Sequence, residues 1–460
     1  MKPTIPKGTR DFNSVEMARR NYIFDTIKKY FRLYGFEQIE TPSMENLSTL
    51  TGKYGDEGDQ LLYKILNSRI HESKDKEKLL DEFKLSLEKS KNTELLTERA
   101  LRYDLTVPFA RYVVMHQHEI TFPFRRFQMQ PVWRADKPQK GRYREFYQCD
   151  ADIIGSNSLV NEVELIQLMD DVYSELKIPV TIKINNRKIL AGIAEVIGAP
   201  ERMLEIIAII DKLDKVGKDK VREELKEKGI LVEPILPSME NLFDFILLNE
   251  GTNQEKLELL KAFFGPSEIG KKGIEEVEYI LSKTKKSLEL DVSLARGLNY
   301  YTGTIIEVKA NAGTFTPSIT GGGRYDDLTG IFGLPNMSGV GISFGIDRIY
   351  DVMEELNLFQ SDKLNKEHTQ VLLMHMGEEE QQHGMQLLFK LRKMGVRAEI
   401  YPDVTKKINK QFDYATKKNI PYSIVIGSNE VKNEKYTLKT KEDKFPDLSL
   451  GEIIHKISNK

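Results

Sequence analysis

The sequence holds one cysteine, Cys149, in 460 residues, so no disulfide can form within the chain. Such sparse cysteine usage is typical of proteins kept in a reducing compartment. The first residues, MKPTIPKGTRDF, lack the apolar core of a signal peptide, and no uninterrupted apolar run approaches the roughly 18 residues of a membrane-spanning helix. We therefore expect a cytoplasmic protein with no membrane partner.

An excess of one charge is missing as well, because the formal net charge is -2 although 30% of the residues are charged. The chain as a whole therefore does not attract nucleic acid or an anionic membrane, and such binding would require a local basic surface. The phosphate-binding pattern G-x-x-x-x-G-K-[ST] is also absent. If the protein binds a nucleotide, side chains must hold its phosphates.

Hydrophobic periodicity and turn residues divide the chain into segments of different character. Residues 15–34 have the spacing of an amphipathic helix, and FEQIETP after Gly35 predicts a strand. The Lys- and Glu-rich stretch 67–98 predicts an exposed helical insertion. The larger predicted segments are a mixed one at 1–186, a helical one at 187–286, short strands with glycine turns at 287–365, and an α/β one at 366–460.

The last segment has a strand-helix-strand-helix-strand order, which implies a compact α/β domain with right-handed crossovers. It carries a small surplus of basic over acidic side chains. That surplus fits an ordinary solvated surface and also leaves an RNA contact open.

A basic loop stands out between two stretches of alternating character, in RRFQMQPVWRADKPQKGRYREFYQCDADIIG at 125–155. Gln128 and Gln130 share one face before the loop, and Gln148, Asp150 and Asp152 share one after it. A hairpin with one packed and one polar face accounts for both halves. An exposed hairpin with a basic tip fits the same spacing. The cations around the loop mouth are Arg134, Lys137, Lys140, Arg142 and Arg144.

Further arginines and glycines gather in four other stretches of the chain. LRYDLTVPFARY at 101–112 predicts a half-apolar strand, and TGGGRYDDL at 320–328 predicts a glycine turn. ARGLNYYTG at 295–303 places an arginine near paired tyrosines, and GVGISFGIDRI at 339–349 places Arg348 at the start of a helix. Together these stretches are typical of an anionic nucleotide site that has no phosphate-binding loop.

These stretches resemble class II aminoacyl-tRNA synthetases, and more specifically the histidyl-tRNA synthetases. Residues 15–42 resemble motif 1 of the class, 125–155 resemble motif 2 and 339–349 resemble motif 3. The stretches at 101–112 and 295–303 resemble the two histidine-specific signatures, which are more specific than the class motifs. The resemblance covers almost the whole chain, and the segment 67–98 is the main part without a counterpart.

Two positions depart from the commonest bacterial pattern. Asp104 stands where many bacterial members have glutamate, and Asn299 stands where aspartate is frequent. Both residues keep a hydrogen-bonding group. The resemblance implies an α+β fold, in which an antiparallel-sheet catalytic domain is split between 1–186 and 287–365 around the helical insertion 187–286. It also implies an anticodon-binding domain at 366–460 and a homodimer built through motif 1.

The resemblance further implies a histidine–tRNA ligase. Such an enzyme joins L-histidine to ATP, forming histidyl-adenylate and pyrophosphate, and then transfers histidine to the 3′ end of tRNA(His). Mg²⁺ would accompany the phosphates of ATP. Since an α-carboxyl group with a pKa of about 3.5 is already ionised, the attack needs no general base. It needs in-line positioning and positive charge near the phosphoryl oxygens.

By the same resemblance, Arg134, Arg296 and Arg348 would be the catalytic cations. Arg134 would hold the α-phosphate, Arg296 would lie near the α-phosphate and the substrate carboxylate, and Arg348 would hold the γ-phosphate. Arg142 and Tyr143 would join Arg134 and Arg348 in binding ATP. Metal ligands are not identified. The residues expected to bind histidine are Asp104, Thr106, Gln148, Asp152, Arg296, Tyr300, Tyr301 and Tyr325.

Two other functions compete with this interpretation. GISFG at 341–345 matches G-x-S-x-G, the nucleophile elbow of α/β-hydrolases, with Asp351 and His368 in the required chain order. That match leaves the hairpin and the two signatures unexplained, and five-residue matches arise easily by chance. Related proteins also regulate a histidine-biosynthetic phosphoribosyltransferase without charging tRNA. They typically lack the anticodon-binding domain and the catalytic signatures, and this chain keeps both.

Histidine spacing offers two weak candidates for a metal site. His116 and His118 flank one residue, and His375, Glu379 and His383 have helical spacing. The second set begins in a predicted strand, which breaks the helical geometry. Surface or packed side chains explain both sets better than metal ligands do.

Overall fold

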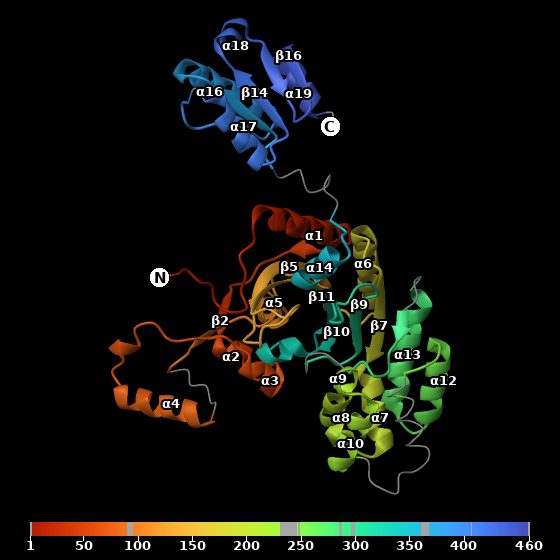
Figure 1. Cartoon of the computed structure of the whole chain (residues 1–460). Coiled ribbons are helices and arrows are strands. Elements are labelled where there is room, and N and C mark those ends of the chain that lie inside the picture. Colours follow the sequence, from red (N-terminus) through yellow and green to blue (C-terminus); the bar gives the residue numbers. More distant parts are fainter. Residues whose placement is uncertain are drawn as a thin grey trace. The chain divides into compact units, whose positions relative to one another are not determined.

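The computed structural model describes residues 2–89, 95–230, 246, 249–284, 288–295, 300–359, 368–405 and 407–458. The chain forms two compact units, Met1–Phe359 and Gln360–Lys460 (Figure 1). Arg296 and Asn299 lie outside the described residues, as does part of the signature at 295–303. No helix among the described residues is both long enough and apolar enough to cross a membrane. The boundaries predicted from the sequence for the four segments, at 1–186, 187–286, 287–365 and 366–460, remain a prediction.

The predicted first helix is confirmed as α1 (Ser14–Leu33). Asn13 caps it by accepting the backbone N–H groups of Val15 and Glu16, and the Glu16 side chain accepts the N–H of Asn13 in return. The strand predicted for FEQIETP is much shorter than expected. Only β1 (Glu37–Gln38) forms, and it pairs in parallel with β5.

The first unit is built on an eight-stranded sheet in the order β1-β5-β6-β11-β10-β9-β7-β8. Its neighbouring strands run antiparallel except at the β1·β5 and β7·β8 edges, which confirms the expected antiparallel-sheet domain. The remaining strands are β5 (Phe124–Trp133), β6 (Glu145–Ile154), β7 (Val180–Asn186), β8 (Leu288–Leu290), β9 (Thr304–Ala310), β10 (Thr320–Asp326) and β11 (Ser338–Gly345).

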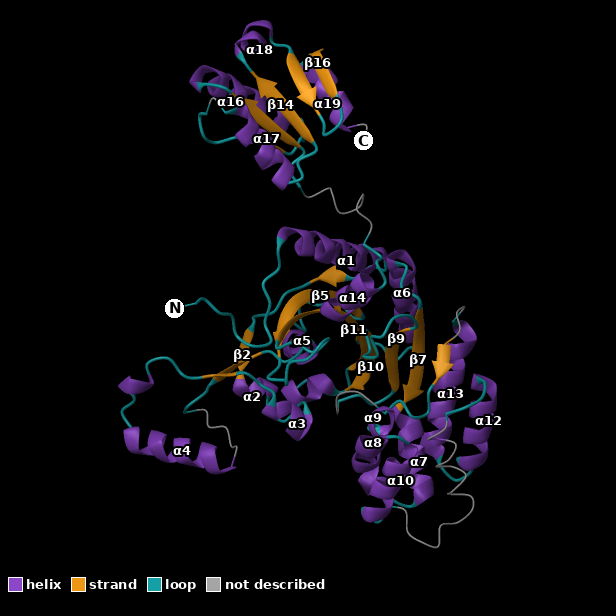
Figure 2. Cartoon of the chain, viewed as in Figure 1, coloured by secondary structure: helices purple, strands orange, loops and turns teal. Residues whose placement is uncertain are grey.

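The predicted hairpin is confirmed, because β5 and β6 pair from Phe124↔Ile154 to Trp133↔Glu145. The alternation predicted for its second strand is also confirmed. Cys149, Ala151 and Ile153 belong to the apolar core, which α1, α6 (Val160–Leu176) and α14 (Ile346–Glu355) cover on one side of the sheet (Figure 2). The polar residues of alternate parity therefore face the other side.

The strand predicted for LRYDLTVPFARY is wrong beyond its first residue. β4 (Arg99–Leu101) ends there, and α5 (Thr106–Met115) follows. Asp104 accepts the backbone N–H of Val107 and so satisfies a donor that a helix start leaves without a partner. Pro108 fits the first turn because its missing N–H has no helical acceptor there. The short sheet around β4 also contains β2 (Met44–Asn46) and β3 (Lys64–Ile65).

The glycine turn predicted for TGGGRYDDL is also wrong, because the stretch forms the central strand β10. A Cβ at Gly322 would collide with the carbonyl oxygen of Gly341, and one at Gly323 would lie 2.5 Å from the carbonyl oxygen of Thr304. These glycines therefore allow close approach of neighbouring strands, and they do not turn the chain.

The helical segment packs around a second hydrophobic core, which also contains Leu290 of β8 and Ile305 of β9. Within it, α7 (Arg187–Ile197) and α13 (Glu268–Lys283) touch so closely that a Cβ at Gly192 would lie 2.6 Å from the Cα of Gly270. The other helices described there are η2 (Pro200–Arg202), α8 (Met203–Ile210), α9 (Leu213–Val216), α10 (Lys218–Glu227) and α12 (Asn253–Phe263).

The exposed helix predicted within 67–98 is confirmed as α4 (Lys76–Lys89). Leu80, Phe83 and Leu87 are all more than half exposed on it. Short helices on either side of β3 complete this region: α2 (Leu47–Leu50), α3 (Gly55–Gln60) and η1 (Ile70–Glu72).

The second unit confirms the predicted strand-helix-strand-helix-strand order. β12 (Val371–His375), α16 (Glu378–Lys393), β13 (Ala398–Ile400), α17 (Ile408–Lys417) and β14 (Tyr422–Ile426) follow one another, and the three strands are parallel. An antiparallel end completes the sheet order β13-β12-β14-β15-β16. Its elements are α18 (Ser428–Asn433), β15 (Tyr436–Lys439), β16 (Lys444–Leu448) and α19 (Leu450–Ser458).

Candidate active site

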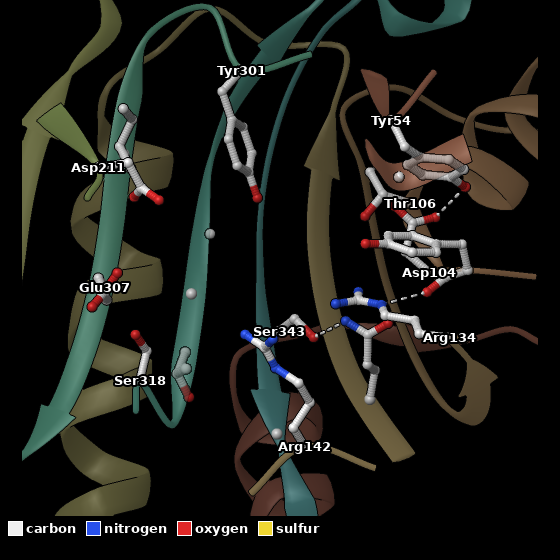
Figure 3. A pocket seen from close by; sticks show the side chains of 18 of the residues that line it. Tyr54, Asp104, Thr106, Arg134, Arg142, Asp211, Tyr301, Glu307, Ser318 and Ser343 are labelled. Atoms are coloured by element: carbon white, nitrogen blue, oxygen red, sulfur yellow. Dashed lines mark hydrogen bonds between the residues drawn. The ribbon is translucent and has the colours of Figure 1, made fainter. Parts of the chain in front are cut away.

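A cavity of about 770 Å³ opens on the polar side of the large sheet (Figure 3). Its walls come from β6, β9, β10 and β11, from the loop between β5 and β6, and from α3, α8 and the first turn of α14. Residues far apart in sequence therefore meet in one place. Nine of the residues expected at the site line this cavity: Asp104, Thr106, Arg134, Arg142, Tyr143, Gln148, Tyr300, Tyr301 and Arg348.

Two other expected residues lie behind the cavity wall. Asp152 and Tyr325 are almost fully buried, and the Tyr325 hydroxyl donates to Asp152 Oδ1 at 2.7 Å. Asp152 also forms an ion pair with the buried Arg126, Oδ2 to Nη2, at 2.7 Å. These residues support the wall and do not line it. Arg296 lies outside the described residues.

Two arginines of the cavity, Arg134 and Arg348, donate to backbone carbonyl groups. Arg134 donates from Nε to the carbonyl oxygen of Tyr103 at 3.1 Å, and its guanidinium lies 4.2 Å above the Tyr103 ring centre. Arg348 donates to the carbonyl oxygens of Gly141 at 2.9 Å and Ser318 at 2.7 Å. Because these acceptors carry no full charge, both guanidinium groups keep their positive charge uncompensated by these bonds.

The loop residues Arg142 and Tyr143 bring further polar groups to this side. Arg142 lies 3.7 Å from Asp136, and the Tyr143 hydroxyl donates to Asp351 at 3.0 Å. Burial raises the pKa of the Tyr143 hydroxyl to about 12, so it stays a donor at neutral pH. The guanidinium of Arg10 lies 3.5 Å from the centre of the Tyr143 ring.

Asp104 is a cavity carboxylate that accepts three hydrogen bonds. Oδ1 accepts the Tyr54 hydroxyl at 2.9 Å and the Val107 N–H at 3.2 Å, and Oδ2 accepts the Tyr300 hydroxyl at 3.2 Å. Burial raises the pKa of the Asp104 carboxyl, and the hydrogen bonds from Val107 and Tyr54 oppose that rise. The three donors stabilise the charged form of a carboxylate that lines the cavity.

Gln148 and Ser343 form a second polar pair on the cavity wall. Gln148 Nε2 donates to Ser343 Oγ at 2.8 Å, while Gln148 Oε1 has no hydrogen-bond partner among the described residues. Asp150 pairs with Ser343 across the sheet and is buried. Burial raises the pKa of Asp150 to about 7, against the opposing effect of Arg126. Asp150 does not line the cavity, so its carboxyl group lies behind this part of the wall.

Sequence reasoning missed Tyr54 and named Ser343 only for a rival function. Tyr54 belongs to no motif, and its partner Asp104 lies 50 residues further along the chain. No periodicity relates the two. Ser343 lies inside β11, paired with Gly321 on one side and Asp150 on the other. A nucleophile elbow needs its serine at a strand-to-helix turn, so the hydrolase interpretation is wrong.

The histidine sets do not form a metal centre in the described part of the chain. No group of three or more His, Cys, Asp or Glu residues there could hold a metal ion. His375 is buried in β12, with Nε2 2.8 Å from the carbonyl oxygen of Tyr401, whereas Glu379 and His383 lie on α16. His116 contacts Glu119 at 3.0 Å.

The family model for histidyl-tRNA synthetase matches residues 76–349, which is more than half of the chain. The chain belongs to the histidyl-tRNA synthetase family. The resemblance found in its motifs is thereby confirmed. A second family model, described as an anticodon binding domain, matches residues 370–460.

Individual relatives agree with this family. The chain is 56% identical over 456 residues to the histidine–tRNA ligase of Bacteroides fragilis strain YCH46, covering 98% of each chain. The crystal structure of histidyl-tRNA synthetase from Nostoc sp. PCC 7120 matches with a TM-score of 0.78 at 27% identity, covering 100% of this chain and 99% of that one.

A third protein shares the fold alone. It is a structure from Bacillus halodurans C described as an ATP phosphoribosyltransferase regulatory subunit/histidyl-tRNA synthetase. It matches with a TM-score of 0.71 at 20% identity, covering 93% of this chain and 99% of that one. At this identity the match carries no information on function.

Proposed function

We propose that this chain is a histidine–tRNA ligase that works in the cytoplasm as a homodimer. It activates L-histidine with ATP to histidyl-adenylate and pyrophosphate, and it transfers the histidyl group to the 3′ end of tRNA(His). Membership of the family and 56% identity to a histidine–tRNA ligase over nearly the whole chain support this activity.

The observation that carries the proposal is that one cavity presents both signs of charge. It presents the Asp104 carboxylate among tyrosines, and the guanidinium groups of Arg134, Arg142 and Arg348 line the same cavity. A substrate that has a cationic ammonium group and reacts with a polyphosphate requires both signs of charge in one place. Histidine and ATP are such a pair.

The activation step follows from that arrangement. The carboxylate of histidine attacks the α-phosphorus of ATP in line with the departing pyrophosphate, and no proton has to be removed from it. Arg134 stabilises the charge that develops at the α-phosphate, and Arg348 holds the γ-phosphate. We assign Arg296 the carboxylate and the α-phosphate by its position in the signature. Removing one preorganised donor of this kind typically lowers the rate about 10²–10³-fold.

Histidine recognition uses the part of the cavity around Asp104. Asp104, Thr106 and Gln148 bind the ammonium group, while Tyr300 and Tyr301 lie around the imidazole ring. Asp152 and Tyr325 hold this wall from behind through their mutual hydrogen bond. A site whose buried polar groups lose their partners with the wrong substrate can discriminate by about 10⁴–10⁵ without editing.

Mg²⁺ would accompany ATP in the proposed reaction and would neutralise phosphate charge. Asp211 and Glu307 line the cavity opposite the labelled arginines (Figure 3), and carboxylate oxygens are ligands that Mg²⁺ prefers. These two residues would therefore hold the ion.

The second unit binds the anticodon part of tRNA(His) in this proposal. The match of an anticodon-binding family model to residues 370–460 supports that role. The regulatory alternative is weaker, because such proteins typically lack this domain.

The decisive experiment is ATP–pyrophosphate exchange by the purified chain with each of the twenty amino acids, without tRNA. We expect exchange with histidine alone, followed by histidine-dependent charging of tRNA(His). Exchange with another amino acid contradicts the substrate assignment, and folded protein that binds histidine without exchange favours the regulatory alternative.

A matched variant separates charge from geometry at the α-phosphate. Arg134→Lys keeps one positive charge and removes the planar fork that Tyr103 orients. We expect kcat for exchange to fall about 10²-fold or more. An unchanged kcat contradicts the role of Arg134.

A further inference from the structure

We propose that Tyr54 is a positioning residue that holds the Asp104 carboxylate in the orientation that receives the ammonium group of histidine. This role rests on the proposed function and adds to it a residue outside every motif of the family resemblance. Tyr54 lies at the start of α3, and the three donors around Asp104 come from different parts of the chain.

The number of hydrogen-bond donors around Asp104 determines how many acceptor positions of its carboxylate remain for a ligand. An ionised carboxylate has about four acceptor positions. Tyr54 and Val107 occupy two at Oδ1, and Tyr300 occupies one at Oδ2. About one position therefore remains on a carboxylate that lines the cavity. The Tyr54 bond at 2.9 Å fixes the rotation of the group and so directs that position.

Tyr54 is itself held tightly. Its ring packs on that of Tyr103 with centroids 4.6 Å apart, and the Arg134 guanidinium also lies on the Tyr103 ring. Gly58, one helical turn further on, makes room for it, because a Cβ at Gly58 would collide with the Cβ of Tyr54. The stack thus connects the proposed ammonium site to the proposed α-phosphate site through three neighbouring side chains.

Packing alone would also bury a tyrosine, since Tyr54 belongs to a small apolar cluster with Leu47 and Leu50. Packing of the ring does not explain why the Tyr54 hydroxyl donates to Asp104. A buried carboxylate is costly unless hydrogen bonds stabilise its charge, and Tyr54 supplies one of the two side-chain hydroxyl bonds to Asp104. Removing the hydroxyl must therefore change the charge and the orientation of Asp104, whereas a packing role depends on the ring only.

The first test is Tyr54→Phe, assayed by histidine-dependent ATP–pyrophosphate exchange with the full chain. A hydrogen bond to a charged group corresponds to about 10–100-fold in binding. We expect KM for histidine to rise by about that factor, with KM for ATP within about twofold of wild type. The matched control is Tyr34→Phe, because the Tyr34 hydroxyl also donates to a carboxylate, Asp171 at 2.6 Å, and lies outside the cavity lining.

The second readout is the pH dependence of kcat/KM for histidine. Losing a donor to the ionised form raises the pKa of Asp104 further, so the acidic limb moves to higher pH in Tyr54→Phe. It stays in place in Tyr34→Phe. The titratable and charged groups that face Asp104 are unchanged in the control and comprise Tyr54, Tyr103, Arg134, Asp150, Asp152, Tyr300 and Tyr301.

The outcomes separate the possible failures. A folded Tyr54→Phe protein with wild-type KM and an unmoved acidic limb overturns the role of Tyr54. If that variant does not fold, Gly58→Ala, which displaces Tyr54 but keeps its hydroxyl, must show the same selective rise in KM for histidine, and its absence overturns the role. A wild-type chain without histidine-dependent exchange contradicts the proposed function instead.

Discussion

At the scale of single residues, the candidate site is characterised by three buried carboxyl groups. Asp104, Asp150 and Asp152 are all buried, and the buried Arg126 pairs with Asp152. Burial raises the pKa of each of the three carboxyl groups. Ionising them away from water should therefore lower the stability of the free protein at neutral pH.

Asp150→Asn tests how much ionising a buried carboxyl group lowers the stability. The pKa of Asp150 is about 7 in the folded state, above the value of about 4 expected for an unfolded chain. The folded state therefore binds more protons between about pH 4 and pH 7, and the free energy of unfolding falls as pH rises through this window. We expect the variant to lose that fall and to be more stable than wild type at pH 8, by roughly 1–4 kcal/mol.

Denaturant unfolding at pH 5 and pH 8 measures this difference. Asp25→Asn, at an exposed position on α1, is the control for the charge change. Equal stability of wild type and Asp150→Asn at both pH values would contradict the prediction. It would show that ionising Asp150 does not lower the free energy of unfolding.

At the scale of elements, the segment before α1 shapes the loop between β5 and β6. Gly8 has a φ of +91° and accepts the backbone N–H of Arg144 at 2.9 Å through its carbonyl oxygen. The Arg10 guanidinium stacks on the Tyr143 ring and pairs with Asp347. A side chain at position 8 would meet both Arg144 and Pro138, so glycine is required where the two segments cross.

Arg10→Ala removes the cation from this crossing. Because Tyr143 and its neighbours form the proposed ATP-binding loop, we expect KM for ATP to rise about tenfold, with KM for histidine little changed. Exchange kinetics with one substrate varied at a time measure both constants. Lys7→Ala is the control, since Lys7 is an exposed cation of the same segment that contributes its carbonyl oxygen to Arg144. Equal effects of the two variants on KM for ATP would show that the stacked position of Arg10 is irrelevant.

At the scale of the whole molecule, the two units have separate hydrophobic cores. The clusters of the second unit contain only residues between 371 and 457, and those of the first unit contain none of them. Among the described residues, those that line the cavity lie between 54 and 348. Amino acid activation therefore depends on side chains of the first unit, while anticodon binding is proposed for the second.

A chain ending at Phe359 tests this division of labour. We expect the shortened chain to keep histidine-dependent ATP–pyrophosphate exchange within a few-fold, because its core and its cavity are intact. Charging of tRNA(His) should fall by at least about 100-fold, since the anticodon contacts are lost. Circular dichroism confirms folding before either assay. Loss of exchange from a folded fragment would contradict the independence of the site.

Sequence patterns determined what local spacing can encode. The apolar spacing of α1, the alternation of the β5·β6 hairpin and the strand-helix order of the second unit are properties of neighbouring residues, and all three are confirmed. The class motifs and the two histidine-specific signatures together also named nine of the side chains that line the cavity. Each of them lies in a continuous motif.

The tertiary structure decided what distant contacts determine. The stretch TGGGRYDDL becomes strand β10 because its glycines admit the neighbouring backbones of β9 and β11. Tyr54 donates to Asp104, which lies 50 residues further along the chain. Asp152 lies behind the cavity wall and forms an ion pair with Arg126. Such contacts depend on which surfaces pack together in three dimensions. The periodicity of a single segment predicts its own secondary structure, but it does not predict which other segment it will contact.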